Sequence, residues 1–321
     1  MPIKAQRLLD WPIIHQGMST SLGNNINGPS LIRVPAWVPQ PLGRYYLYFA
    51  HHEGRSIRLA FADDLTGPWR IFEPGALTIE QSLFPHDAAQ ITPIARTNDD
   101  IAGMGITEHI PHIASPDVLV DDTNQQILMY FHGMVEDGDQ KTRLAQSKDG
   151  LAFTPQPALF DHYYFRVFRY LGWFWVISWG GHLYRAKTAG GPFERGPDLF
   201  QCEPICLDER ILRHLAVLLD GDVLHLFFSR IGDQPETILH TEVQLAPDWT
   251  NWRIGQVSEI LRPTLKWEGA NLPVTRSKAG AAHEAEHGLR DPCVFQDADG
   301  QTYLLYCGSG EQAIGVTALN R

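Results

Sequence analysis

Residues 115–131 read SPDVLVDDTNQQILMYF, which is one apolar strand, a polar turn and a second, aromatic-rich strand. Apolar and polar residues alternate only weakly in both strands, as is typical of sheets that are buried on both faces. The polar run DDTNQQ between them is rich in residues that favour a tight turn. This stretch therefore predicts a β-hairpin that needs a neighbour on each side.

Four other segments follow the same pattern of strand, turn, aromatic strand, polar loop and third strand. Such a unit cannot bury its faces alone, so the copies must stack, and radial stacking of four-stranded units produces a β-propeller. An open solenoid is the alternative, but the last copy stops after its third strand, as expected if another segment closes a ring. The five aromatic strands are YYLYFA from Tyr45, ILMYFH from Ile127, WFWVIS from Trp173, VLHLFF from Val223 and TYLLYC from Thr302.

We therefore predict an all-β fold, a five-bladed β-propeller that spans residues 1–321, with a polar pocket on its axis. The segment 5–15, and within it LLDWPII from Leu8 to Ile14, is expected to supply the missing fourth strand of the last blade. Two inserts, at about 72–112 and 261–289, interrupt the repeat, and long inserts are usually functional or disordered. The blades are expected at residues 25–75, 110–160, 161–205, 210–258 and 288–321.

Composition narrows the function classes. The chain of 321 residues is 44% hydrophobic, carries a formal net charge of -11 and has no basic run, so we expect no nucleic-acid partner. Its first residues lack the apolar core of a signal peptide, and no apolar stretch has membrane-spanning length, so we expect a cytoplasmic protein with no membrane partner. Four cysteines, with Cys202 and Cys206 four apart, are expected to be reduced thiols.

A candidate site follows from the geometry of the repeat. Consecutive strands are antiparallel, so the start of each first strand and the end of each second strand lie on the same face, with the first strand nearest to the axis. The residues at those positions are mostly ionisable and costly to bury unless they are paired or bind a ligand. The candidates are His51, His52, Glu53, His112, Asp117, Arg166, Trp179, His214, Arg230, Asp233, Glu236, Arg290, Asp291 and Glu311.

Structural roles for these residues stay open. Asp291 can be a carboxylate paired with Arg290, and Asp117 can cap the turn after Pro116. Each histidine can be an ordinary core or rim residue, and Glu284 and Glu286 of the second insert are expected to be solvated. Because all five copies carry polar residues at the same end, whereas the opposite ends are plain hairpin turns, we favour a functional site.

The chain resembles the five-bladed propeller glycoside hydrolases, the superfamily of arabinanases, xylosidases and levansucrases that includes family 43. The resemblance covers the whole repeat and is sharpest in RDPCVFQDADGQTYLLY from Arg290, in SPDVLVDDTNQQILMYF from Ser115 and in ADDLTGPW from Ala62. Bacterial members without an assigned activity look most similar. The resemblance implies carboxylates around the axis, one as base or nucleophile, one as acid and one that tunes pKa values.

The chain departs from that pattern in two blades. Gly28-Pro29-Ser30 stands where the family has Asp-Pro in the first blade, and Tyr164 and Arg166 stand where it has a Glu in the third. The resemblance implies that Asp291 is a catalytic carboxylate. Asp117 is the expected second one. We expect the third to be Glu311, with the alternatives Asp233, Glu236, Glu53 and a histidine that serves as the acid.

Three functions follow as hypotheses. The first is a glycoside hydrolase for a small or terminal sugar; Arg166, Arg213, Arg230 and Arg290 would suit an acidic sugar, and Trp179 can stack on a sugar ring. The second is a phosphorylase or transferase on the same fold, and the third is a non-catalytic carbohydrate-binding propeller.

We expect no required cofactor, with a divalent cation on the axis as an alternative. The sequence does not set the oligomeric state.

Overall fold

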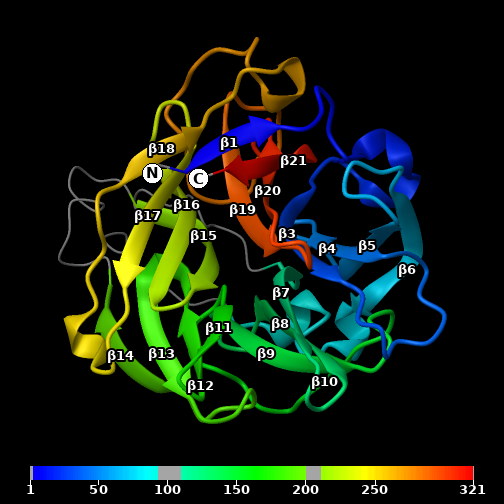
Figure 1. Cartoon of the computed structure of the whole chain (residues 1–321). Helices are drawn as coiled ribbons and strands as arrows, with labels where there is room; N and C mark the ends of the chain where they lie inside the picture. The colour runs from blue at the N-terminus through cyan, green and yellow to red at the C-terminus, as the bar shows by residue number, and fades with distance from the viewer. Residues whose placement is uncertain (1–2, 93–109, 200–210, 321) are drawn as a thin grey trace.

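Five antiparallel sheets stand around a common axis in the computed structural model, which describes residues 3–92, 110–199 and 211–320 (Figure 1). In each sheet the strands follow one another from the axis to the rim. The innermost strands of neighbouring sheets contact one another around the whole ring, in the order β3, β7, β11, β15, β19 and again β3. The predicted five-bladed propeller is confirmed.

Each of the first four blades takes its four strands from one continuous segment. Blade 1 has β3 (Asn27–Arg33), β4 (Tyr45–Ala50), β5 (Ser56–Ala62) and β6 (Arg70–Thr78). Blade 2 has β7 (Ile113–Asp121), β8 (Gln126–Met134), β9 (Gln140–Ser147) and β10 (Thr154–Pro155). Blade 3 has β11 (Arg166–Tyr170), β12 (Trp173–Ile177), β13 (His182–Ala186) and β14 (Glu194–Asp198). Blade 4 has β15 (Ile211–Asp220), β16 (Val223–Ile231), β17 (Ile238–Gln244) and β18 (Ser258–Leu261).

Blade 5 joins the two ends of the chain, as predicted. Its strands β19 (Leu289–Gln296), β20 (Thr302–Gly308) and β21 (Ala313–Asn320) are completed by β1 (Lys4–Arg7), which pairs with β21. A second short strand, β2 (Ile14–His15), pairs with the start of β21.

The closing strand is β1, which shares residues 5–7 with the predicted segment 5–15, whereas the part Leu8–Ile14 was expected to form most of that strand. Most of that segment bridges β1 and β2 instead. Pro12 has no N–H to donate to a strand ladder, and the side chain of Trp11 is 62% exposed. The buried carboxylate of Glu268 fixes β1 in its place, because both of its oxygens contact the guanidinium of Arg7 at 2.8 Å.

Apolar clusters fill the gaps between neighbouring blades. Tyr48 of blade 1 meets Phe153 of blade 2 edge to face, and Trp175 of blade 3 packs on Trp252 of blade 4. The second strands are buried along most of their length because both of their faces meet apolar side chains. This double burial explains the weak alternation in the sequence.

The second insert lies on the face that carries the ends of the second strands. Ser277 exchanges backbone hydrogen bonds with Gly232 and Asp233, which follow β16. Gly288 forms a parallel bridge with Glu236. The first insert begins only after β6, and its residues 93–109 lie outside the described part of the chain.

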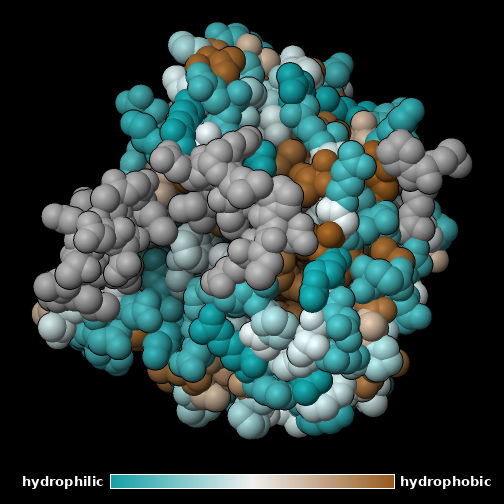
Figure 2. Space-filling view, turned by 90° about the vertical axis from the view of Figure 1, so that its left-hand side faces the viewer, coloured by the Kyte–Doolittle hydropathy of each residue, from teal (hydrophilic) through white to brown (hydrophobic). Residues whose placement is uncertain are grey.

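Hydrophilic residues cover most of the coloured surface in the side view of Figure 2. Within the described residues, no helix has the length and apolar character that a membrane span requires. Cys202 and Cys206 lie outside the described residues. Cys293 and Cys307 are buried free thiols, and burial raises the pKa of Cys293 to about 12.

Candidate functional site

A two-residue bulge marks the axial end of the innermost strands. The register with the second strand shifts between Asn27 and Ser30 in blade 1, and likewise in blades 2, 4 and 5. A bulge re-aims the side chains of its residues, here at the entrance of the axis. Near the starts of the innermost strands of blades 1, 2, 3 and 5 the backbone is left-handed, with φ of 58° at Gly28, 50° at Ser115, 64° at Tyr164 and 51° at Asp291.

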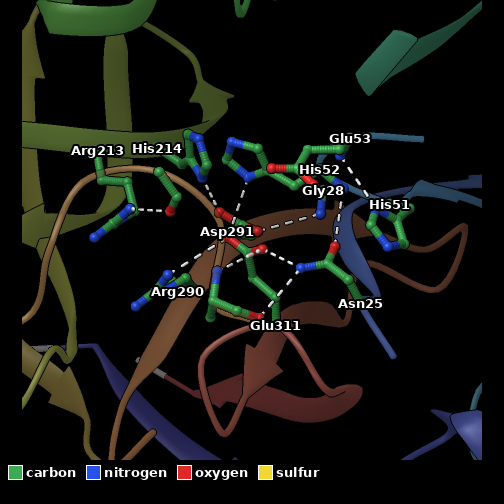
Figure 3. A network of polar contacts seen from close by, with 12 residues as sticks. Asn25, Gly28, His51, His52, Glu53, Arg213, His214, Arg290, Asp291 and Glu311 are labelled. Carbon is green, nitrogen blue, oxygen red and sulfur yellow. Dashed lines mark hydrogen bonds and ion pairs between the residues drawn. The ribbon is translucent and has the colours of Figure 1, made fainter. Parts of the chain in front are cut away.

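Asp291 is the carboxylate at this ring of bulges. Its side chain is buried, one oxygen contacts Nδ1 of His214, and the other accepts a 3.3 Å hydrogen bond from the N–H of Gly28 (Figure 3). Tyr164 stacks flat on the His214 ring, with 3.9 Å between ring centroids. Burial holds the pKa of His214 well below its usual range, so this imidazole is neutral at pH 7.

Glu311 lies beside Asp291 in the same polar network (Figure 3). Its carboxylate accepts a 2.5 Å hydrogen bond from Asn25 and contacts Nδ1 of His52 at 3.3 Å and the guanidinium of Arg290 at 3.5 Å. Burial alone would raise the pKa of Glu311, but the charges of His52 and Arg290 hold it well below its usual range. Glu311 is therefore ionised and cannot serve as a general acid.

Two buried arginines complete the network. Arg213 binds Glu236 at 2.7 Å, and Arg290 contacts both Glu236 at 3.2 Å and Glu286 at 2.5 Å. Burial opposes the charge of Arg290, but the carboxylates of Glu236 and Glu311 raise its pKa above the usual value. Arg290 thus pairs with glutamates, not with Asp291, which leaves Asp291 to His214.

Other predicted residues surround this network. Ring centroids of His112 and His132 are 5.9 Å apart, and His132 lies 6.0 Å from Tyr164. Burial lowers the pKa of His112 to about 4 and that of His132 further. Burial likewise lowers the pKa of His51 to about 4. Nδ1 of His51 accepts the N–H of Glu53, and Arg230 pairs with Asp233 at 3.0 Å.

The structure places Asp117 away from these residues. Its carboxylate accepts a 2.8 Å hydrogen bond from the N–H of Val167 in the next blade, and Ser30, at the same place in blade 1, accepts from Val118 in the same way. Asp117 and Ser30 stand two residues after the left-handed positions Ser115 and Gly28, and two residues of a strand cover about 6–7 Å. Asp117 and Ser30 therefore form a layer that lies deeper on the axis than the bulges. Asp117 bridges blades there and lines an axial hollow together with Ser30, Arg166, Ala216 and Cys293.

Arg166 has a related structural role. Its guanidinium donates to the backbone oxygens of Leu215, Ser115 and Phe165 and lies over the ring of Tyr164. Its Nη2 has no hydrogen-bond partner and its side chain lines the axial hollow, so the expectation that Arg166 holds substrate stays a prediction. The charge of Arg166 partly offsets the effect of burial, which raises the pKa of Asp117.

A stack of rings flanks the axis on blade 3. The ring centroid of Tyr163 is 5.4 Å from that of Trp179 and 5.3 Å from that of His162, and the latter two are 6.5 Å apart, so the three nearly parallel rings form a cluster. All three side chains are partly exposed. The sequence pattern pointed to Trp179 but not to Tyr163, His162 or Asn25, because these three precede the innermost strands and belong to no motif.

The axial histidines and carboxylates do not form a compact ligand set. Within the described residues, no three of them bring ligand atoms within 4.8 Å of one another. The divalent cation on the axis stays a prediction.

No protein-family model matches the chain. Over 308 residues it is 34% identical to "Uncharacterized protein R118" of Acanthamoeba polyphaga mimivirus, a match that covers 90% of this chain and 82% of that protein. The chain belongs to the family of this viral protein. This relative is viral, whereas the motifs of the chain looked most similar to those of bacterial proteins.

Solved structures of enzymes that act on carbohydrates share the fold of this chain. A GH43 beta-xylosidase/alpha-arabinofuranosidase from a compost microbial metagenome aligns with a TM-score of 0.59 and 12% identity, over 99% of this chain and 96% of that one. The GH43_1 enzyme of Xanthomonas citri aligns at 0.57 and 12%, over 97% and 89%. An N-acetylgalactosamine deacetylase from F. plautii aligns at 0.55 and 11%, over 99% and 94%. The predicted fold of the propeller glycoside hydrolases is confirmed.

Proposed function

We propose that this protein cleaves the glycosidic bond of a small or terminal sugar that binds at the axial network, with Asp291 as the working carboxylate. The observation that carries the proposal is the position of Asp291. A buried carboxylate in a left-handed backbone conformation is costly, and such strain concentrates at functional sites. The carboxylate is held from two sides, by Gly28 and His214.

Glycosidic cleavage needs a carboxylate on one side of the sugar and a proton donor on the other. In our proposal Asp291 attacks the anomeric carbon or deprotonates a water that attacks it. The proton for the leaving oxygen comes from His52, whose Nδ1 lies 3.3 Å from Glu311, because Glu311 itself is ionised and cannot donate it. His52 is partly exposed, so a sugar can reach it.

The ring stack of blade 3 supports a sugar ligand. Partly exposed aromatic faces offer apolar area at little entropic cost, and Trp179 and Tyr163 present such faces beside the axis. Arg213 and Arg290 are each paired with glutamates, which favours a neutral sugar over the acidic sugar that their sequence positions suggested. The same pairing disfavours a phosphate pocket and thus a phosphorylase.

A non-catalytic carbohydrate-binding propeller is the second candidate. It is favoured by the strand starts of blades 1, 2 and 3, where Gly28, Ser115 and Tyr164 have a left-handed backbone like that of Asp291 but carry no carboxylate. Two further carboxylates, Glu236 and Glu311, are bound to arginines. Turnover separates the two candidates, because only the hydrolase needs Asp291 for chemistry.

The test compares the full-length protein with Asp291→Asn and with Asp299→Asn, an exposed turn residue on the same blade. Aryl glycosides and disaccharides of neutral and acidic sugars are screened for turnover, and binding is measured by calorimetry. We expect Asp291→Asn to lower kcat/KM roughly 10³-fold while sugar affinity is kept, and Asp299→Asn to behave as wild type. Sugar binding without turnover in the wild type would instead establish the binding propeller, and full activity of Asp291→Asn would remove Asp291 from the mechanism.

A further inference from the structure

A second group of metal-ligating side chains lies on blade 4, near the turn between β15 and β16. His225 is on β16, and His240 and Glu242 are two residues apart on β17. His225 is the cross-strand partner of Glu242, so all three side chains project from the same face of the sheet. Arg230 and Asp233, by contrast, lie at the other end of the β16–β17 pair, with the axial network.

The three ligand atoms converge. Nδ1 of His225 is 3.1 Å from Nε2 of His240 and 3.5 Å from a carboxylate oxygen of Glu242. One ligand atom from each of the three residues lies within 4.8 Å of the others. In a tetrahedral zinc site with bonds of about 2.0–2.1 Å, two ligand atoms are separated by about 3.4 Å. The observed separations are close to this value before any metal is added.

Two of the three groups approach the same ring nitrogen. A neutral imidazole has one N–H, and Nδ1 of His225 is approached by two groups, His240 and Glu242. A single proton on Nδ1 cannot make two good hydrogen bonds at these separations. A divalent cation accepts the lone pairs of all three groups at once.

Burial suits a metal that keeps one open position. The side chains of His225 and His240 form a buried floor, with residue exposures of 4% and 6%. The Glu242 side chain is 54% exposed, so water can reach the cluster from its side. Two histidines and one carboxylate with room for a water are a frequent zinc donor set, and nitrogen ligands disfavour Ca²⁺ and Mg²⁺.

We propose that His225, His240 and Glu242 form a site for a transition-metal dication of the zinc class, which links β16 to β17 on the outer part of blade 4. The site stands apart from the axial network and does not depend on the proposed glycosidase activity. The pairing of β16 with β17 brings the three ligands together only in the folded chain. The metal therefore binds the folded chain and not the unfolded one, which stabilises the fold.

The experiment uses the full-length protein after treatment with a chelator. Zn²⁺ is titrated in competition with a chromophoric chelator, and the melting temperature is recorded with Zn²⁺ and with EDTA. The variants are His240→Ala and Glu242→Gln, and His86→Ala, at an exposed histidine of the first insert, is the matched control. We expect His240→Ala to lose one Zn²⁺ equivalent, Glu242→Gln to bind that equivalent at least tenfold more weakly, and His86→Ala to match wild type.

Glu242→Gln keeps the test decisive if the buried His240→Ala variant does not fold. Its melting temperature in EDTA should equal that of the wild type, whereas the rise caused by Zn²⁺ should be smaller. The proposal is overturned if the wild type binds no Zn²⁺. It is also overturned if Glu242→Gln keeps both the wild-type Zn²⁺ affinity and the wild-type rise in melting temperature, since any zinc would then be bound elsewhere.

Discussion

The Nδ1 atom of His214 contacts the carboxylate of Asp291, so that an imidazole from blade 4 and a carboxylate from blade 5 meet on the propeller axis. His214 is neutral, because burial lowers its pKa. Four blades contribute to this contact, since Gly28 donates to Asp291 and Tyr164 stacks on His214.

Stability should fall when the pH is lowered from 7 to 4. The pKa of buried His112 is about 4, whereas a histidine in an unfolded chain titrates near 6.5. Between these values the unfolded chain binds a proton that the folded chain does not, so the free energy of unfolding increases with pH. His112 alone should account for up to about 3 kcal/mol of this loss.

Denaturant titrations between pH 4 and 7.5 measure this effect. His112→Gln should show a shallower pH dependence than the wild type, whereas His86→Gln, at an exposed position, should not. Equal slopes for His112→Gln and the wild type would show that His112 does not carry the linkage.

Asp117→Ala should weaken the fold and spare the chemistry. The N–H of Val167 loses its acceptor between blades 2 and 3, which should cost about 1–3 kcal/mol of unfolding free energy. Ser30→Ala removes the equivalent acceptor between blades 1 and 2 and is the matched comparison. Denaturation curves and kcat/KM are measured together. A loss of turnover in folded Asp117→Ala as large as that in Asp291→Asn would return Asp117 to the catalytic site.

Arg7→Met should destabilise the ring closure. The substitution leaves the buried carboxylate of Glu268 without its guanidinium partner, and breaking such a pair costs about 3–5 kcal/mol. Arg262 forms a similar two-contact pair with Glu259, but at the surface, so Arg262→Met should cost less than about 1 kcal/mol. Urea unfolding of the two variants measures the difference. Equal effects would mean that β1 does not depend on the buried pair.

Trp179→Ala should weaken sugar binding about tenfold, because the loss of one stacking face costs about 1–1.5 kcal/mol. Trp11→Ala removes an exposed indole from the chain terminus and should leave the affinity unchanged. Calorimetry with the sugar found in the turnover screen gives both dissociation constants. An unchanged affinity in Trp179→Ala would exclude the blade 3 stack from the sugar site.

Local pattern was sufficient to predict the architecture. The five strand-turn-strand copies are buried between neighbours, and that burial selects the apolar aromatic strands visible in the sequence. Asp291 was predictable because it stands beside Pro292 at a strand start. The position of the closing strand was less so, because β1 (KAQR) is short and polar and is held by Glu268, 261 residues away.

The sequence by itself determined the number of blades, the face on which polar residues gather and the presence of Asp291 and Glu311 on that face. Only the tertiary structure decided which of these groups are partners. The bulges place Asp291 at the entrance of the axis and Asp117 in the layer below, although both stand near the start of an innermost strand. Contacts between elements far apart in the sequence, which no local pattern encodes, place Glu311 against His52 and Arg290 and place His214 against Asp291.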